Sequence, residues 1–348
     1  MTSPLRVALV GAGDIGQLRA QAVAKTPGLQ LAAVADLAKD RAERVAVRFH
    51  AEASTDPTAT VRRDDVNVVI VSTPPNRHAE IALAATSAGK HVLCEKPLAH
   101  TLQDAGRMCE SARANGVFLK TGFNHRYFPA MMSARRLIDS GEIGQVIMVK
   151  AYAGHPGGKE FVHDWVRNGA ITGGGSLIDN GIHILDLTRF FLGEEIATAT
   201  GYIANLVWPS ENAEDNGFAL FRSTGGKIAQ VHASWTHWRG YHFAVETFGT
   251  SGYVRASYPP MLVEWGRTLE PGVRARRRYQ VFPLFQIQER LRGWQWTVVK
   301  SFVHELSAFA AGIRTGREVP ATGSDGLRAM QMAHAIYRSS HDGVEVRL

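Results

Sequence analysis

The first 36 residues constrain the fold more than any other part of this 348-residue chain. A short apolar run, Leu5–Val10, leads directly into a Gly-x-Gly-x-x-Gly turn, and a helix-compatible stretch follows. A second apolar run, 31–35, then ends at Asp36. Such a turn bends the chain tightly, lets backbone approach a pyrophosphate and packs the helix closely on the strand. This order of features predicts a dinucleotide-binding fold.

Asp36 favours NAD as the cofactor over NADP. A carboxylate at the end of the second strand accepts hydrogen bonds from the ribose 2′-hydroxyl and repels a 2′-phosphate. Lys39 and Arg41 lie close enough in the sequence to leave NADP open as the less favoured alternative.

The remaining cofactor contacts are expected at the ends of later strands. The third clear strand, 68–71, ends in Ser-Thr-Pro-Pro-Asn, at the edge where parallel sheets bind ligands. Helix capping is the alternative role for Asn76 and His78. The full set of predicted cofactor contacts is Gly11, Gly13, Asp14, Ile15, Gly16, Asp36, Ser72, Thr73, Pro74, Asn76, His78, Glu95 and Lys96.

Strand-like and helix-like segments alternate as far as residue 121, which predicts a parallel, doubly wound sheet. The pattern then becomes strand-rich from 199 to 254, with glycine-containing turns typical of antiparallel neighbours. We therefore expect an α/β protein with a Rossmann domain over 1–123 and a second domain over 124–348. The second is predicted to be α+β with a large, open, mainly antiparallel sheet. The last helices are expected to pack on the first domain or cover the cleft.

Composition argues against several other classes. Hydrophobic residues make up 45% of the chain and charged residues 20%, as in globular proteins. No apolar run approaches the roughly 18 residues of a membrane span. No signal-peptide pattern is visible, and two cysteines cannot form a disulfide framework, so a cytoplasmic location is expected. No metal-site pattern accompanies the 14 histidines, so no metal is expected.

The basic residues gather in one part of the chain. The formal net charge is +7, and many arginines lie between Arg267 and Arg292. We interpret this cluster as solvated surface or an oligomer contact, with recognition of a phosphate on a small substrate as the alternative. Nucleic acid is not an expected partner, because the arginines do not interleave with aromatic residues in a reader motif.

Two further stretches contain residues suited to catalysis. Lys96 follows an apolar strand and precedes a proline, so it is placed to reach both cofactor and substrate. A glycine-led, mostly apolar stretch, 173–183, carries Asp179 and His183 four residues apart, on one face of a predicted helix. Ionisable groups on a buried helix are costly unless they are paired or functional. From this segment alone, an internal Asp–His pair is the alternative.

Three motifs in this order resemble the Gfo/Idh/MocA family of glucose–fructose oxidoreductases, inositol dehydrogenases and rhizopine catabolism proteins. They are the glycine turn, Glu95-Lys96-Pro97 and Gly-Gly-Gly-x3-Asp-x3-His. Segments 73–78 and 122–127 also look like family segments, so the resemblance covers essentially the whole chain.

The resemblance implies a role for each matched residue. Lys96 would lie by the nicotinamide and take part in proton transfer, often with a cis peptide before the following proline. His183 would be the catalytic histidine, with Asp179 as its acidic partner. The predicted substrate contacts are Lys96, Asn124, Arg126, Trp165, Asp179, Asn180 and His183.

The sequence thus predicts an NAD-dependent dehydrogenase acting on a sugar or cyclitol. Histidine suits a general base near neutrality, and a lysine ammonium stabilises a developing alkoxide. The alternatives are a non-catalytic NAD-binding sensor, a ketoreductase acting on nucleotide- or phosphate-linked sugars, and an NADP-dependent imine or biliverdin-type reductase. A homodimer or homotetramer is expected from the resemblance and from three aromatic residues interpreted as strand residues, Trp235, Trp238 and Tyr241.

Overall fold

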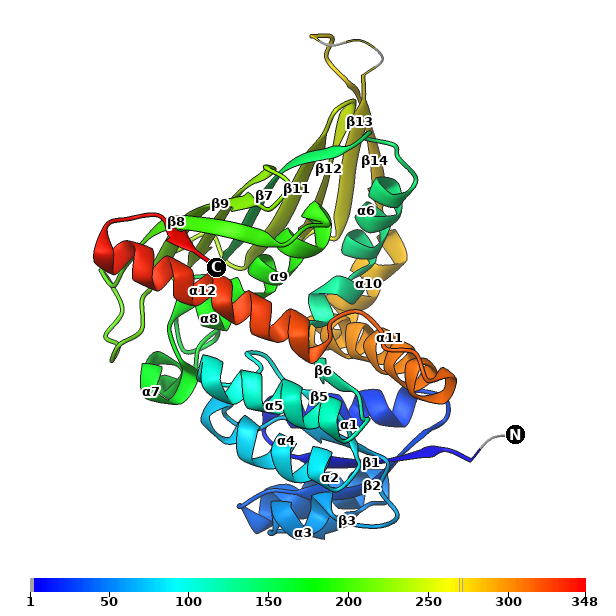
Figure 1. The fold of residues 1–348 in the computed structure, drawn as a ribbon. Coiled ribbons are helices and arrows are strands. Elements are labelled where there is room, and N and C mark those ends of the chain that lie inside the picture. Colours follow the sequence, from blue (N-terminus) through cyan, green and yellow to red (C-terminus); the bar gives the residue numbers. More distant parts are fainter. Residues whose placement is uncertain (1–2, 269, 271) are drawn as a thin grey trace. The chain divides into compact units, whose positions relative to one another are not determined.

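The computed structural model describes residues 3–268, 270 and 272–348, and the chain forms two compact units (Figure 1). The first unit joins Met1–Tyr127 to Arg292–Leu327. The second joins Phe128–Leu291 to Arg328–Leu348. Each unit is therefore built from two separate stretches of the chain.

The first unit contains a six-stranded parallel sheet in the order β3-β2-β1-β4-β5-β6. Its strands are β1 (Leu5–Val10), β2 (Leu29–Ala35), β3 (Glu52–Ser54), β4 (Val68–Val71), β5 (His91–Cys94) and β6 (Leu119–Thr121). Its helices are α1 (Asp14–Lys25), α2 (Lys39–Phe49), α3 (Pro57–Val61), η1 (Pro75–Arg77), α4 (His78–Ser87), α5 (Leu102–Ala114), η2 (Asn124–Tyr127) and α11 (Trp294–Thr315). The strand order reverses beside β1, so the predicted doubly wound sheet is confirmed.

The late helix α11 completes the core of the first unit. It packs against α1 and buries four apolar side chains, Val299, Phe302, Leu306 and Phe309, in the same cluster as residues of β1 and β2. Their spacing of three, four and three residues gives the helix one continuous apolar face. The central strands are apolar on both sides because helices cover both faces of a parallel sheet.

The second unit contains a nine-stranded sheet in the order β14-β13-β12-β11-β7-β10-β9-β8-β15. Its strands are β7 (Val146–Gly154), β8 (Ile196–Ala204), β9 (Asn216–Ser223), β10 (Ile228–Ser234), β11 (His242–Gly249), β12 (Gly252–Tyr258), β13 (Leu262–Arg267), β14 (Arg276–Val281) and β15 (Val346–Arg347). The β7–β10 pair is parallel and the other neighbours are antiparallel, which confirms a mainly antiparallel sheet.

Helices pack on the sheet of the second unit. The remaining elements are α6 (Pro129–Asp139), η3 (Asp164–Arg167), α7 (Gly169–Thr172), α8 (Ser176–Asp179), α9 (Gly181–Leu192), α10 (Pro283–Arg292) and α12 (Gly323–Asp342). α9 packs on β7, β10 and β11, and α6 packs on β12 and β13. Along β9 the buried and exposed residues alternate, so one face of the sheet is core and the other carries exposed side chains such as Phe218 and Leu220.

The arginine cluster lies partly in strand β14, which the sequence did not predict. The strand carries three consecutive arginines, and its side chains are largely exposed, so it lacks the apolar alternation by which a strand is recognised. Arg278 pairs with Glu142 at 2.9 Å, and Arg277 lies 3.5 Å from Glu264. Charged side chains on an edge strand discourage pairing with a further strand.

Two local predictions for the second unit were wrong. The single helix expected after Gly175 is divided into α8 and α9 at Asn180, where the His183 amide donates to the Asn180 carbonyl, three residues back, instead of to a carbonyl four residues back as in a continuous α-helix. Trp235, Trp238 and Tyr241 lie in the connection between β10 and β11 and not in a strand. Trp235 is fully buried, so it is unavailable for a contact between subunits.

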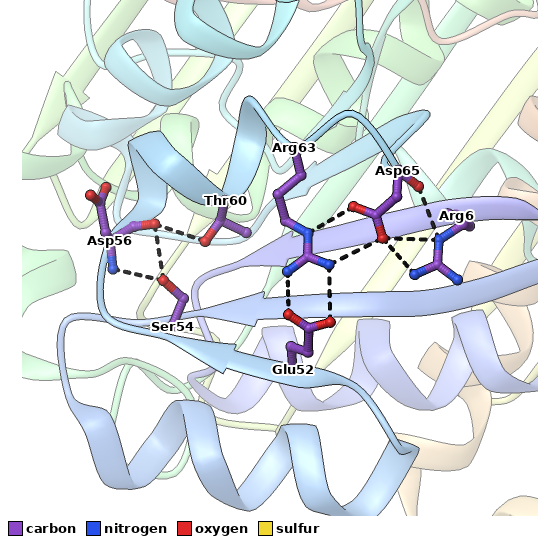
Figure 2. A network of polar contacts seen from close by, with 7 residues as sticks. All are labelled: Arg6, Glu52, Ser54, Asp56, Thr60, Arg63 and Asp65. Carbon is purple, nitrogen blue, oxygen red and sulfur yellow. Dashed lines mark hydrogen bonds and ion pairs between the residues drawn. The ribbon is translucent and has the colours of Figure 1, made fainter.

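A network of mostly exposed charged groups crosses the sheet edge of the first unit (Figure 2). Asp65 accepts from Arg6 at 2.6 Å and from Arg63 Nε at 2.9 Å, and Arg63 also pairs with Glu52 at 2.5 Å. The network links the loop before β4 to β1 and β3. Among the residues with described coordinates, no helix is both long and apolar enough to span a membrane.

Candidate active site

The glycine turn after β1 has the geometry its three glycines require. Gly11 has φ +96°, and a Cβ there would lie 2.5 Å from the Ser72 carbonyl oxygen. A Cβ on Gly16 would collide with the carbonyl of Gly11, whereas one on Gly13 would meet nothing within 4 Å. The outer glycines are thus needed for packing, and the middle one borders open space. α1 starts at Asp14 without a side-chain cap from Gly13, an arrangement suited to an anionic ligand.

Asp36 is held at the end of β2 as a charged acceptor. Its Oδ2 accepts from the Ala12 amide and its Oδ1 from the Ala38 amide, both at 2.8 Å. Arg41 Nη2 donates to Oδ1 at 2.8 Å. Burial raises the pKa of Asp36, but Arg41 and the two amides together lower it below its ordinary value. The carboxylate is therefore ionised at neutral pH, as recognition of a ribose hydroxyl requires.

The segment after β4 offers polar groups for a ligand. Ser72 Oγ and Thr73 Oγ1 are buried, and neither has a hydrogen-bond partner in the described part of the chain. Buried hydroxyls are nearly always paired in folded proteins, so these two fit contacts with a bound cofactor. Pro74 and Asn76 are exposed beside them, and Ile15 is partly exposed across the turn.

His78 joins two of the predicted cofactor loops. Its ring is buried, with Nδ1 3.0 Å from the Pro97 carbonyl and Nε2 2.8 Å from the Thr73 carbonyl. Burial lowers its pKa, although both carbonyls oppose that shift. Neither Asn76 nor His78 makes a side-chain capping bond, so helix capping does not account for them. Direct contact between His78 and the cofactor stays a prediction.

Glu95 belongs to a buried triad that the sequence did not reveal. Arg19 Nε donates to Glu95 at 2.6 Å, and Arg19 Nη1 donates to Glu305 at 2.5 Å. Arg19 is fully buried, with its guanidinium 3.5 Å from the centre of the Phe302 ring. Burial lowers the pKa of Arg19, but both carboxylates raise it by more, so the group stays charged. The triad ties α1, the segment after β5 and α11 together.

Lys96 follows directly after this triad. The Lys96–Pro97 peptide bond is cis, as the family resemblance implied. The Lys96 amide lies 3.4 Å from Glu95 Oε2, so the anchored glutamate also contacts the lysine backbone. Burial and, to a smaller extent, the nearby positive charge of Lys96 lower the pKa of His125 to about 3. A neutral histidine therefore lies close to Lys96.

Asn124 and Arg126, predicted as substrate contacts, are buried in η2 of the first unit. Asn124 Nδ2 donates to Ser301 Oγ at 2.9 Å, and Arg126 Nη1 lies 3.5 Å from Asp325. Both side chains thus contact the C-terminal stretch of their own unit. Substrate contact by either residue stays a prediction.

The second unit carries the other part of the predicted site, centred on Asp179. Trp235 Nε1 donates to Asp179 Oδ2 at 3.3 Å, and His155 Nε2 lies 3.6 Å from the same oxygen. The Gly157 amide donates to His155 Nδ1 at 3.1 Å, which makes Nδ1 an acceptor and leaves the ring proton on Nε2, toward Asp179. The carboxylate therefore accepts a hydrogen bond from Trp235 and lies beside the His155 ring, and these two residues follow different strands.

Asn180 and His183 extend this polar group on a helix pair that is largely apolar. Both residues are buried. Tyr241 lies 3.5 Å from Asn180 Oδ1, and burial and then Asp179 raise the pKa of Tyr241. Asn180 Nδ2 is buried without a hydrogen-bond partner in the described residues, so it can donate to a ligand oxygen. Trp165 lies on η3, partly exposed and stacked on His163.

Sequence reasoning missed several residues because their partners are distant in the chain. Arg19 sits in an amphipathic helix, and only its buried position among apolar neighbours would have marked it, while its partner Glu305 lies 286 residues away. His155 belongs to none of the sequence motifs, and its contact with Asp179 depends on the fold. No group of three or more potential metal-ligating side chains is placed to hold a metal in the chain as described.

Comparison with known proteins places this geometry in a family. Residues 5–123 match the NAD-binding Rossmann fold of the Gfo/Idh/MocA oxidoreductase family, and residues 131–255 match the C-terminal domain of that family. The uncharacterized oxidoreductase YrbE of Bacillus subtilis (strain 168) is 30% identical over 353 residues, covering 100% of this chain and 98% of that protein.

Two further relatives agree. Inositol 2-dehydrogenase of Rhizobium meliloti (strain 1021) is 30% identical over 339 residues, covering 96% of both proteins. The crystal structure of GenD2 from gentamicin A biosynthesis, in complex with NAD, is 29% identical with a TM-score of 0.84, covering 100% of this chain and 97% of that one. The chain therefore belongs to the Gfo/Idh/MocA family of NAD-binding oxidoreductases.

Proposed function

We propose that this oxidoreductase transfers a hydride between NAD and a secondary hydroxyl or keto group of a sugar or cyclitol. The observation that carries the proposal is the polar group around Asp179. A carboxylate held by His155 and Trp235, next to the buried Asn180 amide and followed by His183, suits a ligand with several neighbouring hydroxyls. The name of the inositol 2-dehydrogenase relative supports the same substrate class.

The first unit supplies the cofactor contacts in this proposal. Asp36 would accept from the ribose hydroxyls, while Ser72 and Thr73 would contact the cofactor through their unpartnered hydroxyls. Open space beside Gly13 and the uncapped start of α1 suit the pyrophosphate. When bound, NAD supplies the acceptor or donor of the hydride.

Lys96 and His183 would handle the proton of the same reaction. In the oxidative direction the O–H and C–H bonds of one carbinol break, and the carbonyl forms as hydride leaves carbon. His183 would take the hydroxyl proton as a general base, and the Lys96 ammonium would stabilise the developing alkoxide. Asp179 would hold a neighbouring hydroxyl and so fix which carbon reacts. In the reductive direction the same groups return the proton.

The direct test is absorbance at the reduced-nicotinamide band, with NAD or NADP and a panel of cyclitols, sugars and sugar phosphates. A rise with NAD and one polyol class supports the proposal. NAD binding shown by calorimetry, with no turnover of any polyol or of the matching ketones with NADH, would contradict it and favour a sensor.

We expect Lys96→Ala to lower turnover at least ~100-fold, because both alkoxide stabilisation and proton transfer would be impaired. NAD affinity measured by calorimetry should change little. His183→Ala should also lower turnover, and the double variant should lose less than the product of the two factors, because the residues serve one step. Unchanged turnover in Lys96→Ala would remove the lysine from the mechanism.

We also propose that the protein forms a homodimer or homotetramer through the exposed face of its nine-stranded sheet. Tyr202 and Phe218 are register partners on β8 and β9, and both are exposed with Leu220. Exposed aromatic and aliphatic side chains on one sheet face are typical of protein contacts. Light scattering at micromolar concentration tests this, and Leu220→Arg should shift the mass toward the monomer. A monomeric wild-type protein would refute the proposal.

A further inference from the structure

A buried carboxylate underlies the glycine-led segment of the second unit. Glu214 lies just before β9 and is almost wholly buried. Its Oε2 accepts from the Gly175 amide at 2.8 Å, and its Oε1 accepts from the Leu177 amide at 2.7 Å. The Ser176 amide donates to the Glu214 backbone carbonyl at 2.8 Å. Three successive amides at the start of α8 therefore bond to a single residue.

The close approaches of Glu214 and Tyr337 explain two of the three glycines. A Cβ on Gly175 would collide with the backbone of Glu214, and one on Gly174 would collide with the hydroxyl of Tyr337. Tyr337, on the part of α12 that belongs to the second unit, lies beside the Glu214 carboxylate and acts to lower its pKa. Glu214 and Tyr337 thus occupy the space that larger side chains at 174 and 175 would need.

This arrangement positions Asp179 from two sides. The Asp179 amide donates to the Gly175 carbonyl at 2.8 Å, so the carboxylate sits one helical turn beyond the amides that Glu214 binds. The backbone carbonyl of the next residue, Asp215, accepts from the Trp235 amide at 2.7 Å, and the Trp235 indole donates to Asp179. The dipeptide Glu214-Asp215 therefore fixes the positions of both the Asp179 carboxylate and its donor Trp235.

We propose that Glu214, supported by Tyr337, is a positioning residue that sets the orientation of Asp179 and His183 for the reaction. The inference rests on the proposed function for its kinetic consequence, but not for its structural one. Glu214 accepts from backbone amides through both carboxylate oxygens. If either oxygen stops accepting, the start of α8 shifts, and the position of Asp179 one turn later shifts with it.

The protonation state of Glu214 affects how it positions Asp179. Burial raises its pKa to about 7, against the amides and Tyr337, which lower it. Protonation turns one oxygen into a donor, so an acceptor of the Gly175 or Leu177 amide is lost. The other ionisable groups near the carboxylate are Tyr337, the neighbouring Asp215 and Asp179 on α8, with His334 packed on the Tyr337 ring. The geometry at Asp179 should therefore change between pH 6 and 8, around the Glu214 pKa of about 7.

The test uses Glu214→Gln, which keeps the shape but replaces one acceptor oxygen by a donor. We expect kcat to fall about 10- to 100-fold, the scale of a small misplacement at a site, while the KM for NAD stays within about twofold. Glu194→Gln is the matched control, because Glu194 also accepts from a glycine amide in the second unit, Gly225, but lies outside this network. The control should retain wild-type kcat.

A second readout does not depend on turnover. The indole N–H signal of Trp235 in a ¹⁵N spectrum, assigned with Trp235→Phe, reports on its bond to Asp179. In wild type it should move with pH around 7, and in Glu214→Gln it should be shifted and lose that titration. Tyr337→Phe, which removes one hydroxyl, should give a smaller shift of the indole signal than Glu214→Gln does. It replaces the glutamine variant in this test if that variant does not fold.

The two readouts separate the possible failures. An unchanged indole signal together with unchanged kcat in Glu214→Gln would overturn the positioning role. If wild type turns over no polyol, yet the indole signal responds as expected, the positioning inference stands and the proposed function fails.

Discussion

Glu95 and Glu214 are two buried carboxylates, each beside a residue proposed to act in catalysis, and they are held in opposite ways. Glu95 precedes Lys96 and faces the buried guanidinium of Arg19, which also binds Glu305. Glu214 precedes no catalytic residue in sequence, but it holds the turn that carries Asp179, and its carboxylate accepts hydrogen bonds from backbone amides. The first carboxylate is balanced by a cation and the second by dipoles.

The difference determines how each part of the site responds to pH. A guanidinium stays charged at any ordinary pH, so the anchor of the Lys96 segment is constant. Amide dipoles offset the burial of Glu214 only partly, and its pKa is raised to about 7. The cofactor unit is therefore expected to be insensitive to pH near neutrality, whereas the unit carrying Asp179 and His183 responds to it.

The largest expected effect is that of removing the cation. Arg19→Ala leaves Glu95 and Glu305 buried without their partner, which typically costs about 3–5 kcal/mol. We expect the free energy of unfolding of the first unit, measured by urea denaturation, to fall by that amount. NAD binding, measured by calorimetry, should also be weaker. Glu305→Gln should cost about 1.5–3 kcal/mol, because a neutral acceptor remains for Arg19. Equal losses in the two variants would contradict a central role for the guanidinium.

The change in the stability of the second unit with pH should be somewhat smaller than the loss caused by Arg19→Ala. The pKa of Glu214 rises from 4.5 to about 7 on folding, so protonation favours the folded state. Its stabilising contribution is fully present below about pH 4.5 and is lost as pH rises through 7, by on the order of 3 kcal/mol. Thermal unfolding of wild type and Glu214→Gln from pH 4.5 to 8 measures this. The glutamine variant should lack that part of the slope, and parallel curves would contradict the assignment.

The smallest effect is expected in the exposed network of Figure 2. Arg63→Ala removes the shared partner of Glu52 and Asp65 but should cost less than about 1 kcal/mol, because exposed ion pairs contribute little. Arg63 and then Arg6 hold the pKa of Asp65 below its ordinary value, so this contribution exists above about pH 4 and is lost as pH falls. Chemical denaturation at pH 7 and pH 3, with and without 1 M NaCl, is the measurement. If Arg63→Ala lowered the free energy of unfolding as much as Arg19→Ala, burial would not explain the difference between the exposed network and the buried Arg19 triad.

The sequence predicted those parts of the fold that depend on local pattern. Leu5–Val10, the glycine turn and Asp36 lie within one short segment, and the apolar runs of the Rossmann sheet specify their strands without help from distant residues. The division into α8 and α9 and the strand β14 were missed. The first lies at Asn180, next to Gly181, whose close approach to Ala233 on β10 is a feature of the tertiary structure, and the second depends on pairing with β13.

The site was predictable only as a set of motifs. Lys96, Asp179 and His183 could be selected from spacing and resemblance, but the residues that hold them could not. Arg19 and Glu305 are recognisable only once α1 and α11 pack together. Trp235 was predicted as a strand residue that supports an oligomer contact, because an indole in a strand-like run gives no sign of which way it faces. Burial and long-range pairing are properties of the tertiary structure, which a single sequence does not state.

The discontinuity of the first unit has a consequence for synthesis. Its first stretch ends at Tyr127, whereas Glu305 and the apolar face of α11 are translated more than 160 residues later. Until then the nascent Rossmann sheet exposes the side of α1 that α11 covers, and Arg19 has only one carboxylate. At about 5–20 residues per second, that interval lasts on the order of ten seconds or more. The cofactor unit, although first in the sequence, is therefore completed only after nearly all of the second unit has left the ribosome.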